Sequence, residues 1–146
     1  MADGDNLHLR LELVAPQGPV FEGDADMVVA PAVTGEIGIL PRHAPLVAQL
    51  AIGHTRALTP DGRWLTFAVA EGFVKVQFDK VIVLADTAEE ASKIDVPRAE
   101  KSVERALQRL EMHRLGTVPE DDHVDPYREQ LALKRARNRL KIAEMA

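Results

Sequence analysis

The sequence predicts an α+β protein, with an N-terminal antiparallel β-sandwich or barrel followed by a C-terminal antiparallel hairpin of two α-helices. Up to Leu84, short apolar runs alternate with turn residues, and no helical period lies between them. Beyond that point the apolar residues recur at helical spacing, with two aspartate-and-proline starts and one glycine stop. We therefore place the β-domain at residues 1–87 and the helical hairpin at residues 88–146.

Composition limits the kind of protein. The chain has 146 residues, enough for one domain with an appendage, and aromatic residues make up 4% of it, so the core must be aliphatic. It contains no cysteine, which excludes disulfides, thiolate metal sites and a thiol nucleophile. No apolar run approaches the roughly 20 residues that span a bilayer. Met1 to Asn6 is short and acidic, unlike a signal peptide, so we expect a cytosolic protein that reaches a membrane only through a partner.

Charge is unevenly distributed. The net charge is −5, yet residues 126–146 hold six basic and two acidic side chains, a local excess of four positive charges. A basic C-terminal segment on an acidic body indicates an anionic ligand or an acidic partner. Nucleic acid is not expected as a partner, because the body is acidic and Tyr127 is the one aromatic residue of the hairpin.

The predicted strands begin with Leu7–Leu13, where apolar and polar residues alternate. Turns are predicted at Pro16–Pro19, Pro60–Gly62, Glu71–Gly72 and Asp79–Lys80. The other strands are Val20–Phe21, Met27–Ala30, Ile37–Leu40, Leu46–Leu50, Thr55–Leu58, Trp64–Val69, Phe73–Gln77 and Val81–Leu84. Between residues 31 and 46, two glycines and three prolines fix the backbone around Glu36, Arg42 and His43. These residues are either the corners of a small β-domain or groups presented for binding.

The predicted helices follow a linker, or single helical turn, at residues 87–93. Asp95 and Pro97 start the first helix, Gly116 ends it, and Asp125 and Pro126 start the second. The apolar stripes are Ala99, Val103, Ala106, Leu107 and Leu110 in the first helix, and Leu133, Ala136, Leu140 and Ala143 in the second. Stripes rich in alanine bury little area per residue, so we expect a weakly held, movable hairpin.

Catalytic motifs are missing. The two serines lie outside any Gly-x-Ser-x-Gly elbow, and the chain has neither a Walker-type loop nor a His-Glu-x-x-His pair. The five histidines are scattered, so no metal site is expected. Glu36 and His43 could be interpreted as an acid–base pair. An exposed polar loop at one end of the β-domain is the stronger interpretation. We predict a protein that is not an enzyme and has no catalytic residues.

Arginines dominate the hairpin. Arg98 and Arg105 lie seven residues apart, and Arg135 and Arg139 four apart, so each pair shares a helix face. The second pair has no carboxylate three or four residues away in the sequence. Such a pair is suited to an external anion, either a phosphate or an acidic protein surface. The alternative is a solvated basic face, which is the commoner situation for a generic helix.

The segment Gly35-Glu36-Ile37-Gly38-Ile39-Leu40-Pro41-Arg42-His43-Ala44-Pro45-Leu46 resembles the signature of the epsilon subunit of bacterial F-type ATP synthases, which is called delta in mitochondria. Phe21–Gly23, Ala70–Phe73, Val83–Ala88 and Ile94–Ala99 match that family in order and spacing.

This resemblance implies a ten-stranded sandwich and a non-catalytic rotor subunit at the cytoplasmic face of the bacterial inner membrane, which serves ATP synthesis and proton transport. The sandwich would bind the gamma subunit, and Glu36, Arg42 and His43 would face the c-ring. The hairpin would change between a folded position and an extended one that reaches the catalytic alpha/beta head and blocks ATP hydrolysis.

Some members of this family bind ATP on the folded hairpin, and the resemblance implies such a regulatory site here. The matching residues are Glu89, Ile94, Asp95, Arg98, Ala99, Arg105, Arg135 and Arg139. No required cofactor is implied. Two features depart from the family pattern: Pro97 lies inside the motif, and the loop from Gly116 to Asp125 is long, which affects the helix register. A hypothesis of another class is a free-standing sandwich that binds a partner and dimerises through its hairpin.

Overall fold

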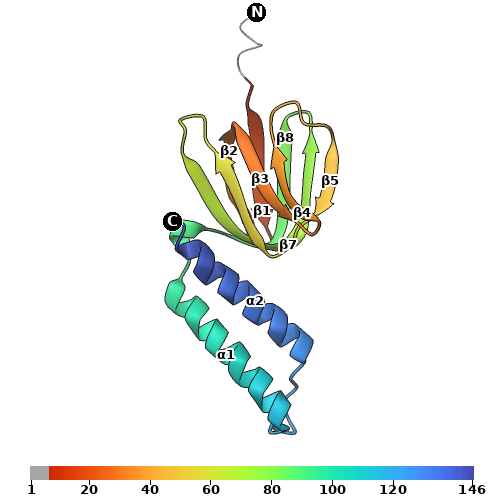
Figure 1. The fold of residues 1–146 in the computed structure, drawn as a ribbon, viewed down its shortest axis with the longest axis vertical. Helices are drawn as coiled ribbons and strands as arrows, with labels where there is room; N and C mark the ends of the chain where they lie inside the picture. The colour runs from red at the N-terminus through yellow and green to blue at the C-terminus, as the bar shows by residue number, and fades with distance from the viewer. Residues whose placement is uncertain (1–6) are drawn as a thin grey trace, which may run out of the picture.

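The computed structural model describes residues 7–146, so the interpretation of Met1 to Asn6 lies outside the described residues. A β-domain and a two-helix hairpin follow one another along the chain, and the hairpin lies at one end of the β-domain (Figure 1). The strands are β1 (Leu9–Ala15), β2 (Gly18–Ala25), β3 (Met27–Ala32), β4 (Gly35–Ile39), β5 (Leu46–Gln49), β6 (Gly53–Leu58), β7 (Trp64–Gln77) and β8 (Lys80–Glu90). The predicted α+β class is confirmed.

Two long strands, β7 and β8, connect the two layers of the sandwich. The first half of β7 pairs with β6 and its second half with β5. Strand β8 pairs with β7 along its length, but with β1 only in its first half. One layer is therefore β2-β1-β8-β7-β5 and the other is β4-β3-β6-β7-β8. Within residues 7–146 the structure has eight strands. The ten strands that the family resemblance implied are obtained when the two halves of β7 and of β8 are counted separately. The β1–β8 pair is parallel, an exception to the predicted antiparallel order.

The bend in β7 lies at Glu71 and Gly72, where the sequence predicted a hairpin turn. That prediction is wrong, because the strand continues through both residues. Their φ angles are 59° and 113°, in the left-handed range that favours glycine. A Cβ atom on Gly72 would lie 1.9 Å from the carbonyl oxygen of Leu84 on β8, so only glycine fits there.

The core fills the space between the layers with aliphatic side chains, as the composition predicted. Leu9, Leu11 and Leu13 alternate inward along β1 and are fully buried. Phe67 is the largest buried side chain, and its ring lies 5.4 Å from that of Phe21, measured between centroids. The opposing layer contributes Val28, Ala30, Ile39 and Val69, and the layer of β1 itself contributes Val74, Val76, Val81 and Val83.

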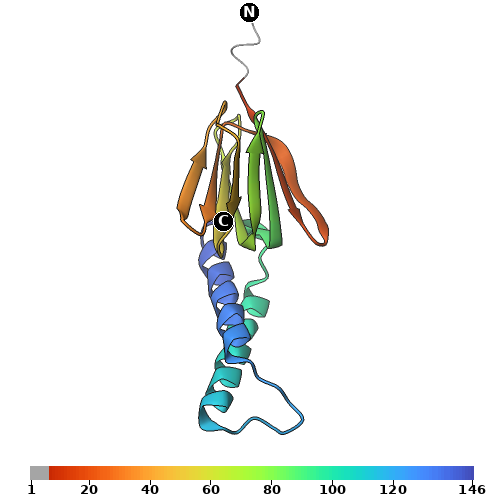
Figure 2. The same ribbon diagram turned by 90° about the vertical axis from the view of Figure 1, so that its right-hand side faces the viewer.

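The hairpin consists of α1 (Val96–Leu115) and α2 (Pro126–Ala143), which run antiparallel side by side (Figures 1 and 2). The predicted starts of both helices and the predicted end of α1 are confirmed, whereas α2 ends at Ala143, before the end of the chain. A side-chain oxygen of Asp95 accepts the Arg98 N–H at 3.1 Å, and one of Asp125 accepts the Tyr127 N–H at 3.0 Å. Gly116 ends α1 with a φ of 70°. No helix within residues 7–146 has both the length and the apolar character needed to cross a membrane.

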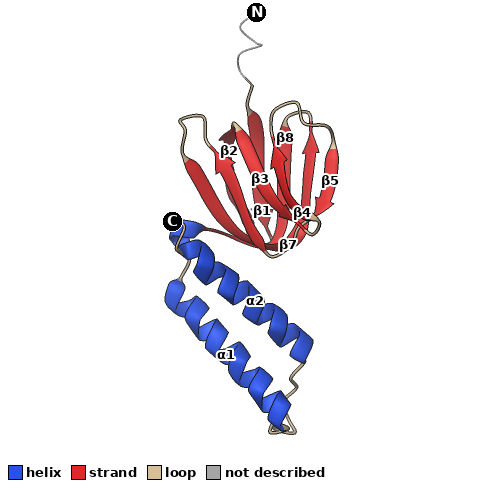
Figure 3. Cartoon of the chain, viewed as in Figure 1, coloured by secondary structure: helices blue, strands red, loops and turns tan. Residues whose placement is uncertain are grey.

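The junction between the two parts differs from the predicted linker. Strand β8 continues through Glu90, a few residues past the boundary placed between 87 and 88, and the short 3-10 helix η2 (Ala91–Lys93) follows it (Figure 3). Helix α2 then docks its C-terminal part on the sandwich. Ile142 is fully buried among Ala68, Ala91 and Ile94, and the Asn138 side chain donates to the Gly53 carbonyl at 2.8 Å.

Candidate functional site

A cavity of about 400 Å3 lies where β8, α1 and α2 meet. Its lining brings together four of the residues named from the sequence: Glu89, Arg98, Arg135 and Arg139. The other lining residues are Thr87, Ser102, Ala132 and Ala136. Small residues on the facing helices leave room for the long arginine side chains to reach the same space.

Both α2 arginines of the cavity lining, Arg135 and Arg139, are ion-paired to the sandwich. The Nη2 atom of Arg135 donates to Oε1 of Glu71 at 2.7 Å, and Nη2 of Arg139 donates to Oε2 of Glu89 at 3.1 Å. The interpretation that this pair lacks counter-charges is therefore wrong for the folded molecule. The carboxylates lie 64 and 50 residues away in the chain, so the spacing within the helix could not reveal them.

Arg139 and Glu89 also approach each other through a second pair of atoms. The Nε atom lies 2.6 Å from Oε1 of Glu89, but its N–H is not directed at an acceptor, although the atom is buried. The buried Nε atom is therefore held next to the Glu89 carboxylate, and a ligand in the cavity would meet the Nη groups of Arg139 instead.

Arg98 carries the third guanidinium of the cavity. Its side chain is exposed, and no carboxylate of residues 7–146 lies within ion-pair distance of it. The lining thus holds three guanidinium groups and one carboxylate. Such a lining favours a ligand with several negative charges, because guanidinium groups bind phosphate and carboxylate through paired N–H donors.

The remaining motif residues support the cavity from outside. Ile94 is buried against Ile142, Asp95 caps α1, and Ala99 is fully buried. Arg105 is exposed and absent from the lining. It shares a helix face with Arg98, but seven residues correspond to about 10 Å along the axis.

Glu36, Arg42 and His43 do not form one cluster. Glu36 lies near the start of β4 and pairs with Pro31, whereas Arg42 and His43 follow the other end of that strand. The Arg42 N–H donates to Asp79 in the β7–β8 turn at 2.6 Å. The interpretation of Glu36 and His43 as one polar loop is wrong, because Glu36 belongs to a strand whose remaining residues separate it from His43 by roughly 10 Å.

His54 lies among charged side chains. Burial lowers the pKa of His54, the charges of Arg56 and of Lys141 on α2 lower it further, and Glu36 opposes this shift. The strand geometry places Glu36 at the end of the sandwich that carries α2, because Glu36 pairs with Pro31 beside Gly53, whose carbonyl accepts from Asn138 of α2.

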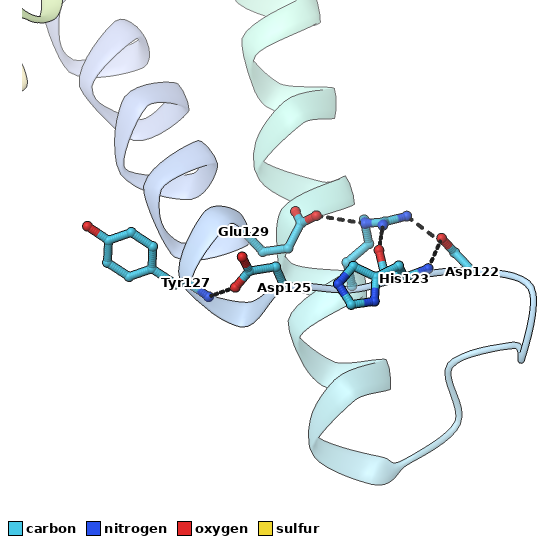
Figure 4. Close-up of polar contacts among 6 residues, drawn as sticks. Asp122, His123, Asp125, Tyr127 and Glu129 are labelled. Atoms are coloured by element: carbon cyan, nitrogen blue, oxygen red, sulfur yellow. Dashed lines mark hydrogen bonds and ion pairs between the residues drawn. The ribbon is translucent and has the colours of Figure 1, made fainter.

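An arginine network closes the far end of the hairpin (Figure 4). Nε of Arg109 donates to Glu129 at 2.8 Å, and Nη2 donates to the His123 carbonyl at 3.1 Å. Asp122 lies 3.5 Å from Nη1, and the bond to Glu129 is the main reason that the pKa of Arg109 is raised. These contacts tie the long loop to both helices, while Arg135 and Arg139 still reach the cavity.

Sequence reasoning missed Glu71, Asn138, Thr87, Ser102 and Arg109. Only Glu71 has a local signal, an acidic residue between two apolar runs, and the sequence predicts a turn there. Within residues 7–146, no three histidine or carboxylate side chains gather in a way that could hold a metal ion.

Comparison with known proteins decides the family. Residues 8–91 match the family profile described as ATP synthase, Delta/Epsilon chain, beta-sandwich domain, and residues 92–144 match the long alpha-helix domain of the same chain. The chain belongs to the ATP synthase delta/epsilon family. The resemblance found in the sequence is confirmed.

Related epsilon chains match nearly the whole sequence. The ATP synthase epsilon chain of Desulforamulus reducens is 44% identical over 135 residues, and that of Bacillus cytotoxicus is 46% identical over 135 residues. In both cases the match covers 92% of this chain and 96% of the relative.

Solved structures share the fold. A chain of the Euglena gracilis mitochondrial ATP synthase, from a structure described as OSCP/F1/c-ring in rotational state 1, superposes with a TM-score of 0.72 at 19% identity. The match covers 90% of this chain and 79% of that one. A chain of the Tetrahymena thermophila mitochondrial ATP synthase, described as central stalk/c-ring, gives a TM-score of 0.54 at 11% identity. That match covers 94% of both chains.

Proposed function

We propose that this chain is a non-catalytic subunit of the central rotor of an F-type ATP synthase. It couples the gamma subunit to the c-ring in proton-driven ATP synthesis, and its hairpin restrains ATP hydrolysis when extended toward the catalytic alpha/beta head. Family membership over residues 8–144 supports the proposal. The complex would hold the chain at the cytoplasmic face of the inner membrane. Arg42 and His43 are the stronger candidates for the c-ring contact, because α2 occupies the other end of the sandwich.

The proposed regulatory role of the hairpin rests on one observation, the way in which α2 docks on the sandwich. One buried apolar cluster, the Asn138 bond and two ion pairs hold α2 on the sandwich. Both ion pairs are partly exposed, and such pairs contribute about 0–1 kcal/mol each. An element held this way detaches at modest free-energy cost, as movement of the hairpin requires.

ATP is the regulatory ligand that the cavity suits. Arg98, Arg135 and Arg139 would bind the triphosphate, with Arg105 as an outer contact and Glu89 at the sandwich side. The site needs β8, α1 and α2 together, so ATP would bind only the docked hairpin. A ligand present at 100 times its Kd then favours that state by about 2.7 kcal/mol and relieves inhibition.

Titration of ATP into the full chain, followed by amide chemical shifts, tests this site. We expect saturable shifts of the hairpin amides at or below millimolar ATP, and a loss of affinity of at least about tenfold in Arg139→Ala, since charge-assisted hydrogen bonds contribute roughly 1.5–3 kcal/mol. Arg137→Ala is the matched control, because Arg137 is exposed on α2 outside the cavity lining. Absence of shifts, or equal affinity in the two variants, would contradict the ATP site.

A further inference from the structure

The ion pair between Arg135 and Glu71 joins the cavity to the bend of β7. Arg135 lines the cavity, while Glu71 lies outside its lining and reaches Arg135 from the sandwich side at 2.7 Å. About a third of each side chain is exposed, 36% for Arg135 and 35% for Glu71. Two of the three guanidinium groups available to an anion are therefore already bound to carboxylates of the same chain: Arg139 to Glu89 within the lining, and Arg135 to Glu71 outside it.

The backbone places Glu71 there at a cost. Its φ of 59° is in the left-handed region, which side chains other than glycine, asparagine and aspartate rarely adopt. Gly72 must be glycine because of its contact with β8, but nothing comparable requires a glutamate at 71. The strained position carries a carboxylate that meets α2, and such positions concentrate at functional sites.

An anion in the cavity and the Glu71 carboxylate require the same guanidinium. Glu71 occupies the Nη2 donor of Arg135, which a phosphate could otherwise use, and its negative charge also repels that phosphate. Glu89 differs from Glu71, because it belongs to the cavity lining and pairs with Arg139.

We propose that Glu71 is a built-in competitor for the anionic ligand of this cavity. Without ligand it holds α2 on the sandwich through Arg135, and with ligand it weakens the grip of Arg135 on the phosphate groups. Glu71 thereby sets the ligand concentration at which the docked hairpin becomes occupied. This inference rests on the proposed ATP site.

Calorimetric titration of the full chain with ATP, and separately with inorganic triphosphate, tests the competition. The variants are Glu71→Gln, Arg135→Ala and the double variant, with Glu22→Gln as a control because Glu22 is exposed and paired with Arg10 on β1. Amide exchange of α2 without ligand gives the docked fraction of each variant, which converts the apparent Kd into the intrinsic one.

We expect Glu71→Gln to tighten intrinsic binding of both ligands by about three- to tenfold, less at high salt, since one nearby like charge is removed. The gain should vanish in the Arg135→Ala background, and Glu22→Gln should behave as the unmodified chain. Without ligand, α2 amides should exchange faster in Glu71→Gln.

Three results would overturn the inference. Unchanged or weaker intrinsic binding in Glu71→Gln, with clear binding by the unmodified chain, would refute the competition and leave the ATP site intact. If Glu71→Gln still tightens ligand binding in the Arg135→Ala background, Glu71 does not act through Arg135. Absence of binding by every variant at millimolar ligand would remove the site itself and the inference with it.

Discussion

At the scale of single residues, the bend of β7 depends on the pair Glu71 and Gly72. Both have positive φ, and the carbonyl of Leu84 leaves no room for a side chain at 72. This bend lets one strand serve both layers of the sandwich. It also brings Glu71 to Arg135, so the same two residues shape the sandwich and its contact with α2.

Gly72→Ala should therefore destabilise the protein severely. We expect a loss of about 3 kcal/mol or more in the free energy of unfolding, because the new Cβ overlaps the backbone of β8 and the φ is unfavourable. Denaturant unfolding followed by circular dichroism measures it. Gly35→Ala is the matched control: Gly35 has a φ of 126°, but an added Cβ meets no atom within 4 Å. Equal losses in the two variants would contradict the overlap as the cause.

Residues of the site were predictable from the sequence where the evidence was local. The spacing of Arg135 and Arg139 placed them on one face of α2, and both reach the cavity. Their partners Glu71 and Glu89 could not be found this way, because sheet pairing and helix docking bring them close from far along the chain. The role of Glu71–Gly72 was misassigned because a polar residue followed by glycine indicates a hairpin turn and a strand bend equally well.

At the scale of elements, the helices were predictable and the strands less so. Caps are local chemistry, so Asp95, Gly116 and Asp125 marked the ends of α1 and α2. The extension of β8 to Glu90 was not predictable, because residues 87–90 are mostly polar and become strand by pairing with β7. Residues 87–90 are mostly polar because they belong to the surface on which α2 docks, although they form regular strand structure.

The Arg109 network makes a prediction for the hairpin as an element. Arg109→Met should keep an unbranched apolar side chain on α1 but leave Glu129, which is 18% exposed, without its cation. We expect amide exchange of residues 117–130 to become several-fold faster, because a poorly solvated carboxylate without a partner is unfavourable. Arg114→Met removes a solvent-exposed pair with Glu111 on the same helix and should change exchange little. Slow exchange retained in Arg109→Met would show that the apolar contacts alone hold the loop.

At the scale of the whole molecule, the two parts differ in how firmly they are held. The sandwich has a continuous apolar core between its layers, whereas α2 meets it through one small cluster, one side-chain hydrogen bond and two partly exposed ion pairs. This difference fits the proposed function, in which the sandwich stays bound while the hairpin moves. The alanine-rich helix stripes predict weak docking from the sequence, and the movement of the hairpin stays a prediction.

The most direct measurement is the rate of ATP hydrolysis by the assembled ATP synthase, with the full chain or with a chain that ends after Lys93. That end point keeps all of β8 and removes both helices. We expect faster hydrolysis with the shortened chain, unchanged proton-driven synthesis, and co-purification of both chains with the complex. If the complex with the full chain and the complex with the shortened chain hydrolyse ATP at equal rates, and each retains its chain, a regulatory role for the hairpin is contradicted.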